Sequence, residues 1–489
     1  MRAAASALLA AWLLVGCGGG GDTAGDRPPG ASSPAAPLPP LPDPAPAREC
    51  TGTTVLCVDA GSTASAPDGS AGQPFASVRE AIAAAEPDTV IQVAAGEYDE
   101  PLEISGARGL QLIGGFPAGD FSQRDPAVNE TVLRGNGDAA VVSIVDSDGV
   151  RIEGFGLTGG GGHSGVYRLA GGGVYVDETA SGASMVANRI YGNAVDRGSA
   201  PAEGLGGGIA AFGTDVSIVG NLIEGNRAGR GAGIAVVGGA TIDGNVVRDN
   251  VGVGDHAGGL YLAGRVEVTR NRVQGNRIGT DYGWGGGIHV FGDDSAATLR
   301  GNVVAENGAP TAGSGVFIDD GADATLVGEL YYRNDCTVQG GEGLYADSGG
   351  QTPTVVRVAN VTVAEHRCPD VALGGNAILA EVSDQGGPKT AVTVVNSILW
   401  DNAGRDVAGV GTTVEVTYSI TEEAIEGTGN LSEDPQFADP GASDFHLREG
   451  SPGIDAGDPS ADVGAEPEPN GGRIDLGHTG GTSDATTSA

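Results

Sequence analysis

The chain repeats a short pattern in which glycines precede an apolar residue, an intervening residue and a second apolar residue. In one copy, alternation places Ile288 and Val290 on one face and His289 on the other, which is the period-two pattern of a β-strand. The pattern returns roughly every 24 to 33 residues, which indicates stacked structural repeats. The copies read "GGGVYV", "GGGIAA", "GAGIAV", "GGLYL", "GGGIHV", "GSGVFI" and "GEGLYA".

Pairs of asparagines five residues apart accompany these strands, as in the segment "VVGGATIDGNVVRDNVG" with Asn245 and Asn250. Asparagine tolerates the left-handed backbone conformation that sharp turns require. Side-chain amides stacked at the ~4.8 Å strand spacing can donate to and accept from their neighbours. We therefore predict an inward asparagine ladder at each bend, a structural role rather than a ligand-binding one. Similar pairs are Asn221 and Asn226, Asn271 and Asn276, and Asn302 and Asn307.

Short strands at regular intervals, without room for crossover helices, predict an all-β fold, a parallel β-helix whose core grows with each coil. A short helix is predicted to cap its first coil, because Ser77 and Glu80 form an S-x-x-E capping box and Pro87 ends the helix. Such a cap covers exposed strand edges. Residues 49–109 are assigned to this cap and the first coil, which "TVIQVAAGEYDE" opens, and residues 110–428 to the repeats.

Composition narrows the possible partners. The chain has 88 glycines among 489 residues without a three-residue period, which excludes collagen. Its formal net charge of -37 would repel phosphate backbones, so nucleic acid is not an expected partner. Such acidity suits solubility, divalent cations or a cationic partner.

The N-terminus predicts export. Residues 1–16 have one basic residue, Arg2, and an apolar run that is too short to span a membrane, which is typical of a signal peptide. Their end and Cys17 resemble the lipobox of bacterial lipoproteins, in which the cysteine becomes lipidated; an ordinary signal peptide is the alternative. The Gly- and Pro-rich residues 17–48 read as a disordered tether. We expect a lipid-anchored, monomeric protein of the bacterial cell envelope, at the outer membrane or cell surface, which contacts the membrane only through its anchor.

The four remaining cysteines predict two disulfides in an oxidising compartment. Cys50 and Cys57 flank a short loop. Cys336 lies seven residues after Glu329 and Cys368 eight after Asn360, two residues that we assign to ladder positions on adjacent coils. The expected bridges are thus Cys50–Cys57 and Cys336–Cys368. A metal site is the alternative, although no histidine has zinc-like spacing to either pair.

Segments at both ends resemble known surface proteins. "DGSAGQPFASVREAIAAAEPDTVIQVAAGEYDE" (68–100) and "GGFPAGDFSQRDPAVNETVLRGNG" (114–137) are similar to segments of secreted right-handed parallel β-helix proteins of the pectate-lyase-like superfamily. "NSILWDN", "GNLSEDPQFADP", "FHLREGSPGIDAGD" and "NGGRIDLGHTGG" resemble the choice-of-anchor C-terminal region of bacterial surface β-helix proteins. The resemblance implies a right-handed parallel β-helix with a choice-of-anchor-like region at 429–481. Residues 482–489 are expected to form a disordered tail.

The resemblance leaves activity open, because this fold hosts lyases, hydrolases, epimerases and non-enzymatic adhesins. The Gly-His-Gly and Arg-Ile-Lys motifs of polygalacturonase-like members are missing from this sequence. Its single lysine, Lys389, is isolated in a loop, so a lyase base would have to be an arginine, and no arginine is singled out by its position. The preferred hypothesis is a cell-surface lipoprotein whose solenoid binds or displays a ligand without chemistry. The expected ligand is a polysaccharide. The alternative is a calcium-assisted polysaccharide lyase or a glycoside hydrolase that acts on acidic polysaccharide.

The outward face of the glycine-flanked strands carries the candidate site. Four successive coils place a ring side chain in one row, and carboxylates follow two positions further along. Rings can stack on sugar faces, and closely stacked carboxylates would be stabilised by a Ca²⁺ ion, which prefers hard oxygen ligands. Solvent exposure and ordinary strand stabilisation remain the alternative explanation. The candidate ligand-binding residues are Tyr261, His289, Phe291, Phe317 and Tyr345, and the candidate calcium ligands are Asp293, Asp294, Asp319, Asp347 and Glu381.

Overall fold

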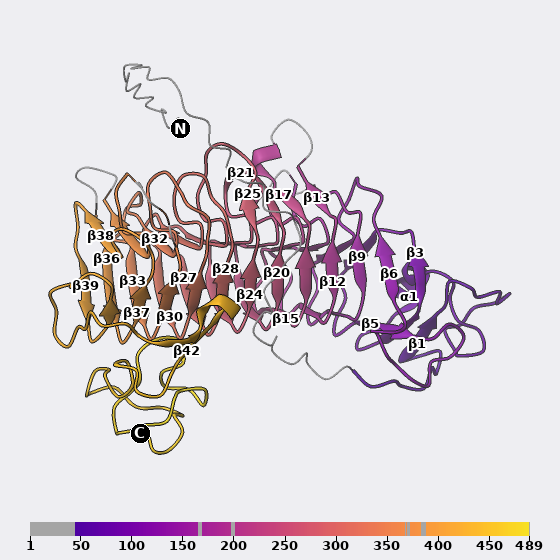
Figure 1. Cartoon of the computed structure of the whole chain (residues 1–489). Helices are drawn as coiled ribbons and strands as arrows, with labels where there is room; N and C mark the ends of the chain where they lie inside the picture. The colour runs from indigo at the N-terminus through magenta and orange to yellow at the C-terminus, as the bar shows by residue number, and fades with distance from the viewer. Residues whose placement is uncertain are drawn as a thin grey trace, which may run out of the picture.

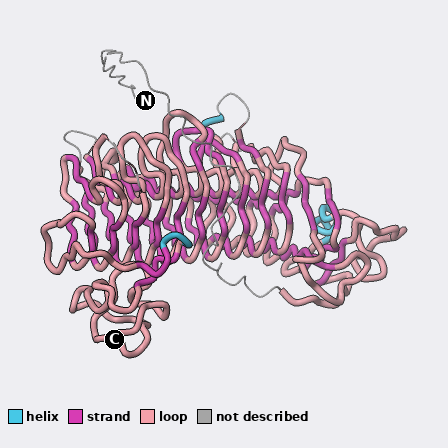
Figure 2. The backbone as a smooth tube through the Cα atoms, viewed as in Figure 1, coloured by secondary structure: helices cyan, strands magenta, loops and turns pink. Residues whose placement is uncertain are grey.

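The computed structural model describes residues 45–488 except 165–168, 197–200, 367, 369–371 and 383–387. Its strands stack as coils of one elongated solenoid, from the indigo end at α1 (Val78–Ala84) to the orange end (Figure 1). Strands and loops dominate, and the helices are short (Figure 2). The predicted all-β parallel β-helix is confirmed. The predicted signal peptide, Cys17 and all but the last few residues of the tether lie outside the described residues.

Three long parallel sheets form the walls of the solenoid. Sheet I has the order β1 (Val55–Val58), β2 (Val90–Ala94), β5 (Gln111–Phe116), β8 (Arg151–Glu153), β11 (Ser184–Val186), β15 (Val216–Val219), β19 (Gly239–Asp243), β23 (Arg265–Thr269), β27 (Ala296–Arg300), β30 (Asp323–Val327), β33 (Val355–Ala359), β36 (Ala391–Val395), β39 (Val414–Thr417). Sheet II has the order β3 (Gly96–Tyr98), β6 (Thr131–Arg134), β9 (Gly156–Thr158), β12 (Arg189–Tyr191), β16 (Leu222–Glu224), β20 (Val246–Arg248), β24 (Arg272–Gln274), β28 (Val303–Ala305), β31 (Leu330–Tyr332), β34 (Thr362–Ala364), β37 (Ile398–Trp400), β40 (Ile420–Thr421).

Sheet III is the wall formed by the glycine-flanked strands. Its order is β38 (Val407–Val410), β35 (Ile378–Glu381), β32 (Leu344–Ala346), β29 (Val316–Asp319), β26 (Ile288–Phe291), β22 (Leu260–Leu262), β18 (Ile234–Val236), β14 (Ile209–Ala211), β10 (Val174–Val176), β7 (Val142–Val145), β4 (Leu102–Ser105). A small sheet IV lies between sheets II and III along the chain, with β13 (Ala194–Val195), β17 (Arg227–Arg230), β21 (Val251–His256) and β25 (Arg277–Ile278).

The solenoid interior is one continuous apolar core. Ile288 pairs with Val316 on the next coil, and both side chains are fully buried, as the period-two pattern predicted. The glycines before these strands are required by close packing between coils. A Cβ atom on Gly287 would lie 2.6 Å from the carbonyl oxygen of Gly315 and 2.9 Å from a methyl group of Val304. Any side chain there would therefore push neighbouring coils apart.

Two asparagine ladders line the bends, as predicted. Asn245 donates through its backbone N–H and its Nδ2 to Oδ1 of Asn271, at 2.8 and 2.9 Å, and through Nδ2 to the Ile218 carbonyl at 2.8 Å. Its own Oδ1 accepts from Asn221. Each amide thus satisfies buried backbone groups on the coils around it. The first ladder contains Asn188, Asn221, Asn245, Asn271 and Asn302, and the second Asn193, Asn226, Asn250, Asn276, Asn307 and Asn334.

Both ladders change composition in the later coils. Glu329 ends the amide run of the first ladder, where its Oε1 accepts from Asn302. The assignment of Asn360 to the next position is wrong by one residue: Val361 occupies it and donates its N–H to the Ser397 hydroxyl. Asn360 instead takes the positive-φ turn position before it. In the second ladder His366 replaces asparagine, with Nε2 3.1 Å from Nδ2 of Asn334.

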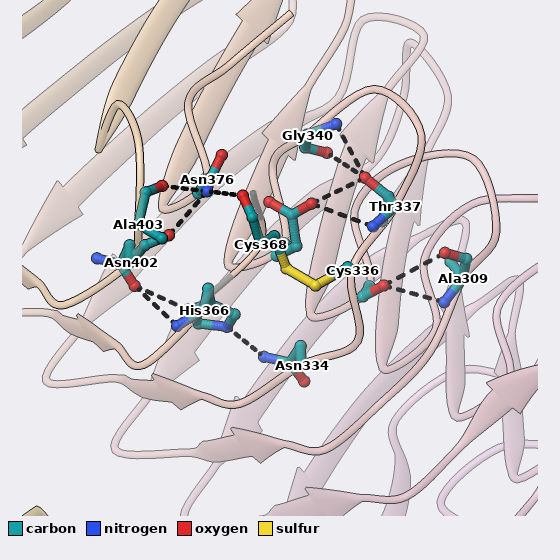
Figure 3. The surroundings of a disulfide bond; sticks show 12 residues. Ala309, Asn334, Cys336, Thr337, Gly340, His366, Cys368, Asn376, Asn402 and Ala403 are labelled. Atoms are coloured by element: carbon teal, nitrogen blue, oxygen red, sulfur yellow. Dashed lines mark hydrogen bonds between the residues drawn. A yellow bond between two sulfur atoms is a disulfide. The ribbon is translucent and has the colours of Figure 1, made fainter. Parts of the chain in front are cut away.

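Both predicted disulfides are confirmed. Cys50–Cys57 joins Cα atoms 5.9 Å apart, and Cys336–Cys368 joins Cα atoms 5.4 Å apart. With the ladder corrected, each cysteine of the second bridge lies seven residues after its ladder position, Glu329 or Val361, so the bridge connects equivalent sites on adjacent coils. Figure 3 shows it beside the second ladder, near Asn334, His366 and Asn402.

The cap at the N-terminal end is confirmed with two differences. The Ser77 hydroxyl accepts from the N–H of Glu80 at 3.3 Å, but the reciprocal carboxylate is that of Glu100, which accepts from the N–H of Val78 at 2.8 Å. Strand β1 pairs with β2, so one strand of sheet I precedes the segment expected to open the first coil. The sequence could not place Glu100, because the connection between β3 and β4 that carries it meets the start of the helix only in the tertiary structure.

The C-terminal region packs against the outer face of sheet II as an antiparallel hairpin, β41 (Phe437–Asp439) and β42 (Asp444–Leu447), followed by loops (Figure 1). The predicted disordered tail differs from the structure, because Thr486 donates to the Leu447 carbonyl and Ser488 to the Asp455 carboxylate. No helix among the described residues is long and apolar enough to cross a membrane.

The ladder predicts the effect of one substitution. Asn245→Leu removes the acceptor of the buried Asn221 backbone N–H and the side-chain donor to the Ile218 carbonyl, so we expect the free energy of unfolding to fall by roughly 1 to 3 kcal/mol. Thr241→Leu, on the exposed face of β19, is the matched control and should change it by no more than about 0.5 kcal/mol. Urea unfolding with equal midpoints for the two variants would contradict the buried ladder.

His366 predicts acid sensitivity. Its Nε2 faces a donor, Nδ2 of Asn334, and its Nδ1 faces an acceptor, Oδ1 of Asn402, so the ring is neutral in the folded state. Burial lowers the pKa of His366 from 6.5 to about 4. Between these values the unfolded chain binds more protons, so stability falls as pH drops through this window, by up to about 3 kcal/mol.

We expect His366→Asn to reduce this acid-dependent loss, measured as the difference in unfolding free energy between pH 7 and pH 4. His446→Asn is the control, because its ring is 48% exposed and lies outside the ladder. Equal pH dependence in the parent and the His366→Asn variant would show that His366 is already charged in the folded protein.

Candidate functional site

The row of rings predicted on sheet III is present and in register. Tyr261 pairs with His289, His289 with Phe317, and Phe317 with Tyr345. The Phe317 ring stacks on His289 with centroids 4.6 Å apart and on Tyr345 at 4.9 Å. The alternation of the strands therefore turned these side chains away from the solenoid core, as the sequence indicated.

The same rings are buried, which contradicts their expected role as an open sugar platform. Their residues are 5%, 0%, 2% and 2% exposed in the order Tyr261, His289, Phe317, Tyr345. Residues that precede the strands of sheet III along the chain pack onto this row of rings. One of them is Trp284, whose ring centroid lies 6.2 Å from that of Phe317. A sugar cannot reach the ring faces without displacing this layer. The burial could not be read from the strands, because the covering residues belong to other coils.

Two of the predicted calcium ligands, Asp293 and Glu381, accept hydrogen bonds from other groups of the protein. Oδ1 of Asp293 accepts from the N–H groups of Gln351 and Thr352, and Glu381 accepts from the Tyr345 hydroxyl at 2.8 Å. Asp294 is exposed on the turn after β26. Within the described residues, no three His, Cys, Asp or Glu side chains are arranged to hold a metal ion. The expected set of Asp293, Asp294, Asp319, Asp347 and Glu381 is therefore not assembled into a site there.

A different group of polar side chains meets at this place. Arg230 at the end of β17 pairs with His256 at the end of β21. The His256 ring lies 4.8 Å from that of His289, and His289 Nε2 lies 3.6 Å from Oδ2 of Asp319. Oδ1 of Asp255 lies 3.6 Å from Nη2 of Arg230 and 3.6 Å from Nε2 of His256. We call these residues, with the neighbouring Asp320, the imidazole–carboxyl cluster: Arg230, Asp255, His256, His289, Asp319 and Asp320.

Burial sets the protonation states in the cluster. Desolvation is the main cause that lowers the pKa of His256 and of His289 to about 3, with Arg230 adding to the effect on both. Both rings are therefore neutral at physiological pH. Desolvation raises the pKa of Asp319 and of Asp320 to about 7. The charge of Asp347 adds to the effect on Asp319, and that of Asp319 to the effect on Asp320, so this pair of carboxyls retains a proton near neutral pH.

Several polar atoms of the cluster lack partners. Among the described residues, neither ring nitrogen of His289 has a hydrogen bond, and the same holds for Nδ1 of His256 and Nε of Arg230. Buried polar groups are nearly always paired, because an unpaired one costs about 1–3 kcal/mol. A neutral imidazole offers one donor and one acceptor nitrogen and the guanidinium only donates, so the group as a whole matches a ligand rich in hydroxyl groups.

The cluster reaches the surface on one side. The side chains of Arg230 and Asp255 are 33% and 43% exposed, that of His256 is 14% exposed and that of Asp319 13%, while His289 lies fully inside. Phe291 is half-buried beside His256, with ring centroids 6.1 Å apart. A ligand can therefore contact the cluster from its Arg230 side, with His289 supporting the site from behind.

Sequence reasoning found His289, Phe291 and Asp319 but missed Arg230, His256 and Asp320. Arg230 and His256 directly precede the glycine-flanked strands in "GRGAG" and "GDHAGG". Residues that directly precede a glycine-flanked strand lie beside the outward row of rings. Aligning the sequence repeats so that they include the end of the preceding strand could therefore have identified Arg230 and His256. Asp320 was visible as one half of an Asp-Asp pair, but only its burial distinguishes it from the other carboxylates.

Comparison with known proteins agrees with the topology. The family model "Right handed beta helix region" matches residues 127–304 and 172–359. Among solved structures, the chain is similar to pectate lyase Pel9A, with 12% identity, a TM-score of 0.47, and coverage of 88% of this chain and 98% of that one. It is also similar to a rhamnogalacturonan lyase, with 12% identity, a TM-score of 0.37, and coverage of 79% and 90%.

No curated protein sequence matches the chain significantly. The family match covers the central coils in which sheets I to III and both asparagine ladders are regular. Together with the parallel order of the sheets, it identifies the fold as a right-handed parallel β-helix.

Proposed function

We propose that the protein is a bacterial cell-surface β-helix that binds a neutral polysaccharide at the imidazole–carboxyl cluster. The observation that carries the proposal is the partly exposed group of Arg230, Asp255 and His256, in which Nε of Arg230 and Nδ1 of His256 have no hydrogen-bond partner among the described residues. Sugar hydroxyls both donate and accept, and thus can satisfy imidazole nitrogens, a guanidinium and carboxyls together.

Charge favours a neutral ligand. The whole chain carries a formal charge of -37, and the cluster adds carboxyl groups beside a single arginine. An acidic polysaccharide would be repelled by this field, whereas a neutral one is indifferent to it. The cluster also draws on four coils through β17, β21, β26 and β29, so an extended polymer could contact several of its residues at once.

A second candidate function is acid–base cleavage of the same ligand. The adjacent, largely buried carboxyls of Asp319 and Asp320 favour it: desolvation raises the pKa of each to about 7, and a carboxyl that stays protonated near neutral pH can act as a general acid. Such activity would be lost as pH rises above 7, since the acid must hold its proton. Hydrolysis would also need a second carboxylate at a separation of roughly 5 to 9 Å.

Binding of the purified full-length protein to neutral and uronic-acid polysaccharides tests the proposal. We expect retardation in affinity electrophoresis with at least one neutral polymer, and Arg230→Ala should weaken it about tenfold, equivalent to about 1.4 kcal/mol. Arg265→Ala, an exposed arginine on the outer face of sheet I, is the matched control and should bind like the parent.

Two outcomes would decide against this assignment. Equal binding by the parent and the Arg230→Ala variant would place the ligand elsewhere. Release of reducing ends or of unsaturated, ultraviolet-absorbing products would establish cleavage, and Asp320→Asn should then abolish turnover while retaining binding. The absence of products with all polymers would leave the protein as a binder.

We also propose that Cys17 is lipidated and anchors the protein to the envelope. Stable anchoring would depend on the attached acyl chains rather than on the acidic body. Cys17→Ser should therefore move the protein from the membrane fraction to the soluble fraction in detergent-free fractionation. A variant that stays wholly with membranes would contradict this proposal.

A further inference from the structure

A hollow of about 360 Å³ lies between the outer face of sheet II and the C-terminal hairpin. Its size falls in the range of about 300–1,000 Å³ that is typical of small-molecule sites. Such sites are common where two parts of a protein meet. The residues that matter for its chemistry are Trp400, Phe437, Phe445, Asp434, Gln436 and Arg448.

One wall of the hollow belongs to the solenoid. Trp400 ends β37, pairs with Ala364 of β34 and is half-buried. In earlier coils the outer face of sheet II carries charged pairs, such as Arg189 and Arg248 with Glu224. The later coils instead place apolar side chains outward, so this part of the sheet is built to be covered.

The other wall is the C-terminal region, which is held firmly in place. Phe445 is 2% exposed and packs at a centroid distance of 5.3 Å on both Tyr332 of β31 and Phe437 of β41. The Arg333 guanidinium donates to the Pro440 carbonyl at 2.6 Å and to the Ser443 hydroxyl at 3.1 Å. The hollow therefore has two ordered walls that come from distant parts of the chain.

Two asparagines at turns of the later coils hold the C-terminal region at further points by hydrogen bonds. Nδ2 of Asn360 donates to the Asp475 carbonyl at 2.9 Å, and Oδ1 of Asn396 accepts from the N–H of Asp458 at 2.7 Å. At this turn position before the first ladder, the two amides therefore tie the last coils to the C-terminal region.

The lining combines aromatic surface with polar groups of both signs. Trp400 presents a partly accessible ring, while Phe437 and Phe445 meet edge to face at 87°. Asp434, Gln436 and Arg448 are exposed around it, which supplies acceptors and donors. Aromatic rings pack against the C–H faces of sugars, and carboxylate, amide and guanidinium groups bind their hydroxyls.

We propose that this hollow is a second carbohydrate site, which takes one or two residues of a neutral saccharide with Trp400 as the stacking platform. It lies on sheet II, away from the imidazole–carboxyl cluster on sheet III, and does not depend on the function proposed for that cluster. Its formation requires the C-terminal region to be docked, so the region completes a binding site in addition to covering the sheet.

Tryptophan fluorescence can test the site directly. The chain has three tryptophans: Trp12 in the predicted signal peptide, Trp284 beside the cluster and Trp400 in the hollow. In a Trp12→Phe/Trp284→Phe variant the emission reports Trp400 alone. We expect it to change on titration with maltose, cellobiose or mannobiose at up to about 10 mM, the range of weak saccharide binding.

Matched variants make the outcome decisive. In isothermal titration, Trp400→Leu should weaken binding of the same disaccharide at least tenfold, whereas Trp284→Phe and the exposed Arg265→Ala should leave it unchanged. If Trp400→Leu lowers the melting temperature markedly, Gln436→Ala, an exposed substitution, should still weaken binding. No change in Trp400 emission with any probe, or unchanged affinity in the Trp400→Leu variant, would overturn the proposal. Loss of polymer binding in Arg230→Ala alone would bear only on the cluster.

Discussion

The hydrogen bonding of backbone groups at the bends is the constraint on which this solenoid depends. Every coil turns sharply, and each turn would bury N–H and carbonyl groups that no strand can satisfy. The asparagine amides solve this problem because one side chain, such as that of Asn245, both accepts from the coil before it and donates to the coil after it. Together with the parallel pairing of the strands, these bonds hold the coils, and the outward rows on them, in register.

That register explains how residues far apart in sequence form one site. Arg230, His256, His289 and Asp319 come from β17, β21, β26 and β29 on four successive coils, yet the stacking of the coils holds them close together. Once the rings of sheet III are covered, the cluster is largely removed from water, and desolvation becomes the dominant cause of every pKa shift in it. The same burial that removes the open sugar platform thus creates neutral imidazoles and a carboxyl pair that keeps its proton.

The C-terminal region depends on the solenoid in a different way. It forms little regular structure of its own, and its apolar side chains are buried against the outer face of sheet II. Asn360 and Asn396, at the positive-φ turn position before the first ladder, hydrogen-bond to its backbone and so tie the last coils to it. The hollow beside Trp400 exists only because the two parts meet.

By itself, the sequence determined the repeat, the inward and outward alternation, both ladders and both disulfides, because these depend on local periodicity and on spacing between equivalent positions. It placed His289, Phe317 and Tyr345 in one outward row correctly for the same reason. Only the tertiary structure decided that the row is buried, that Arg230 and His256 complete the cluster, and that Val361 rather than Asn360 continues the first ladder. Burial and partner choice depend on what neighbouring coils and the C-terminal region place over a residue, and no local pattern in the chain encodes that.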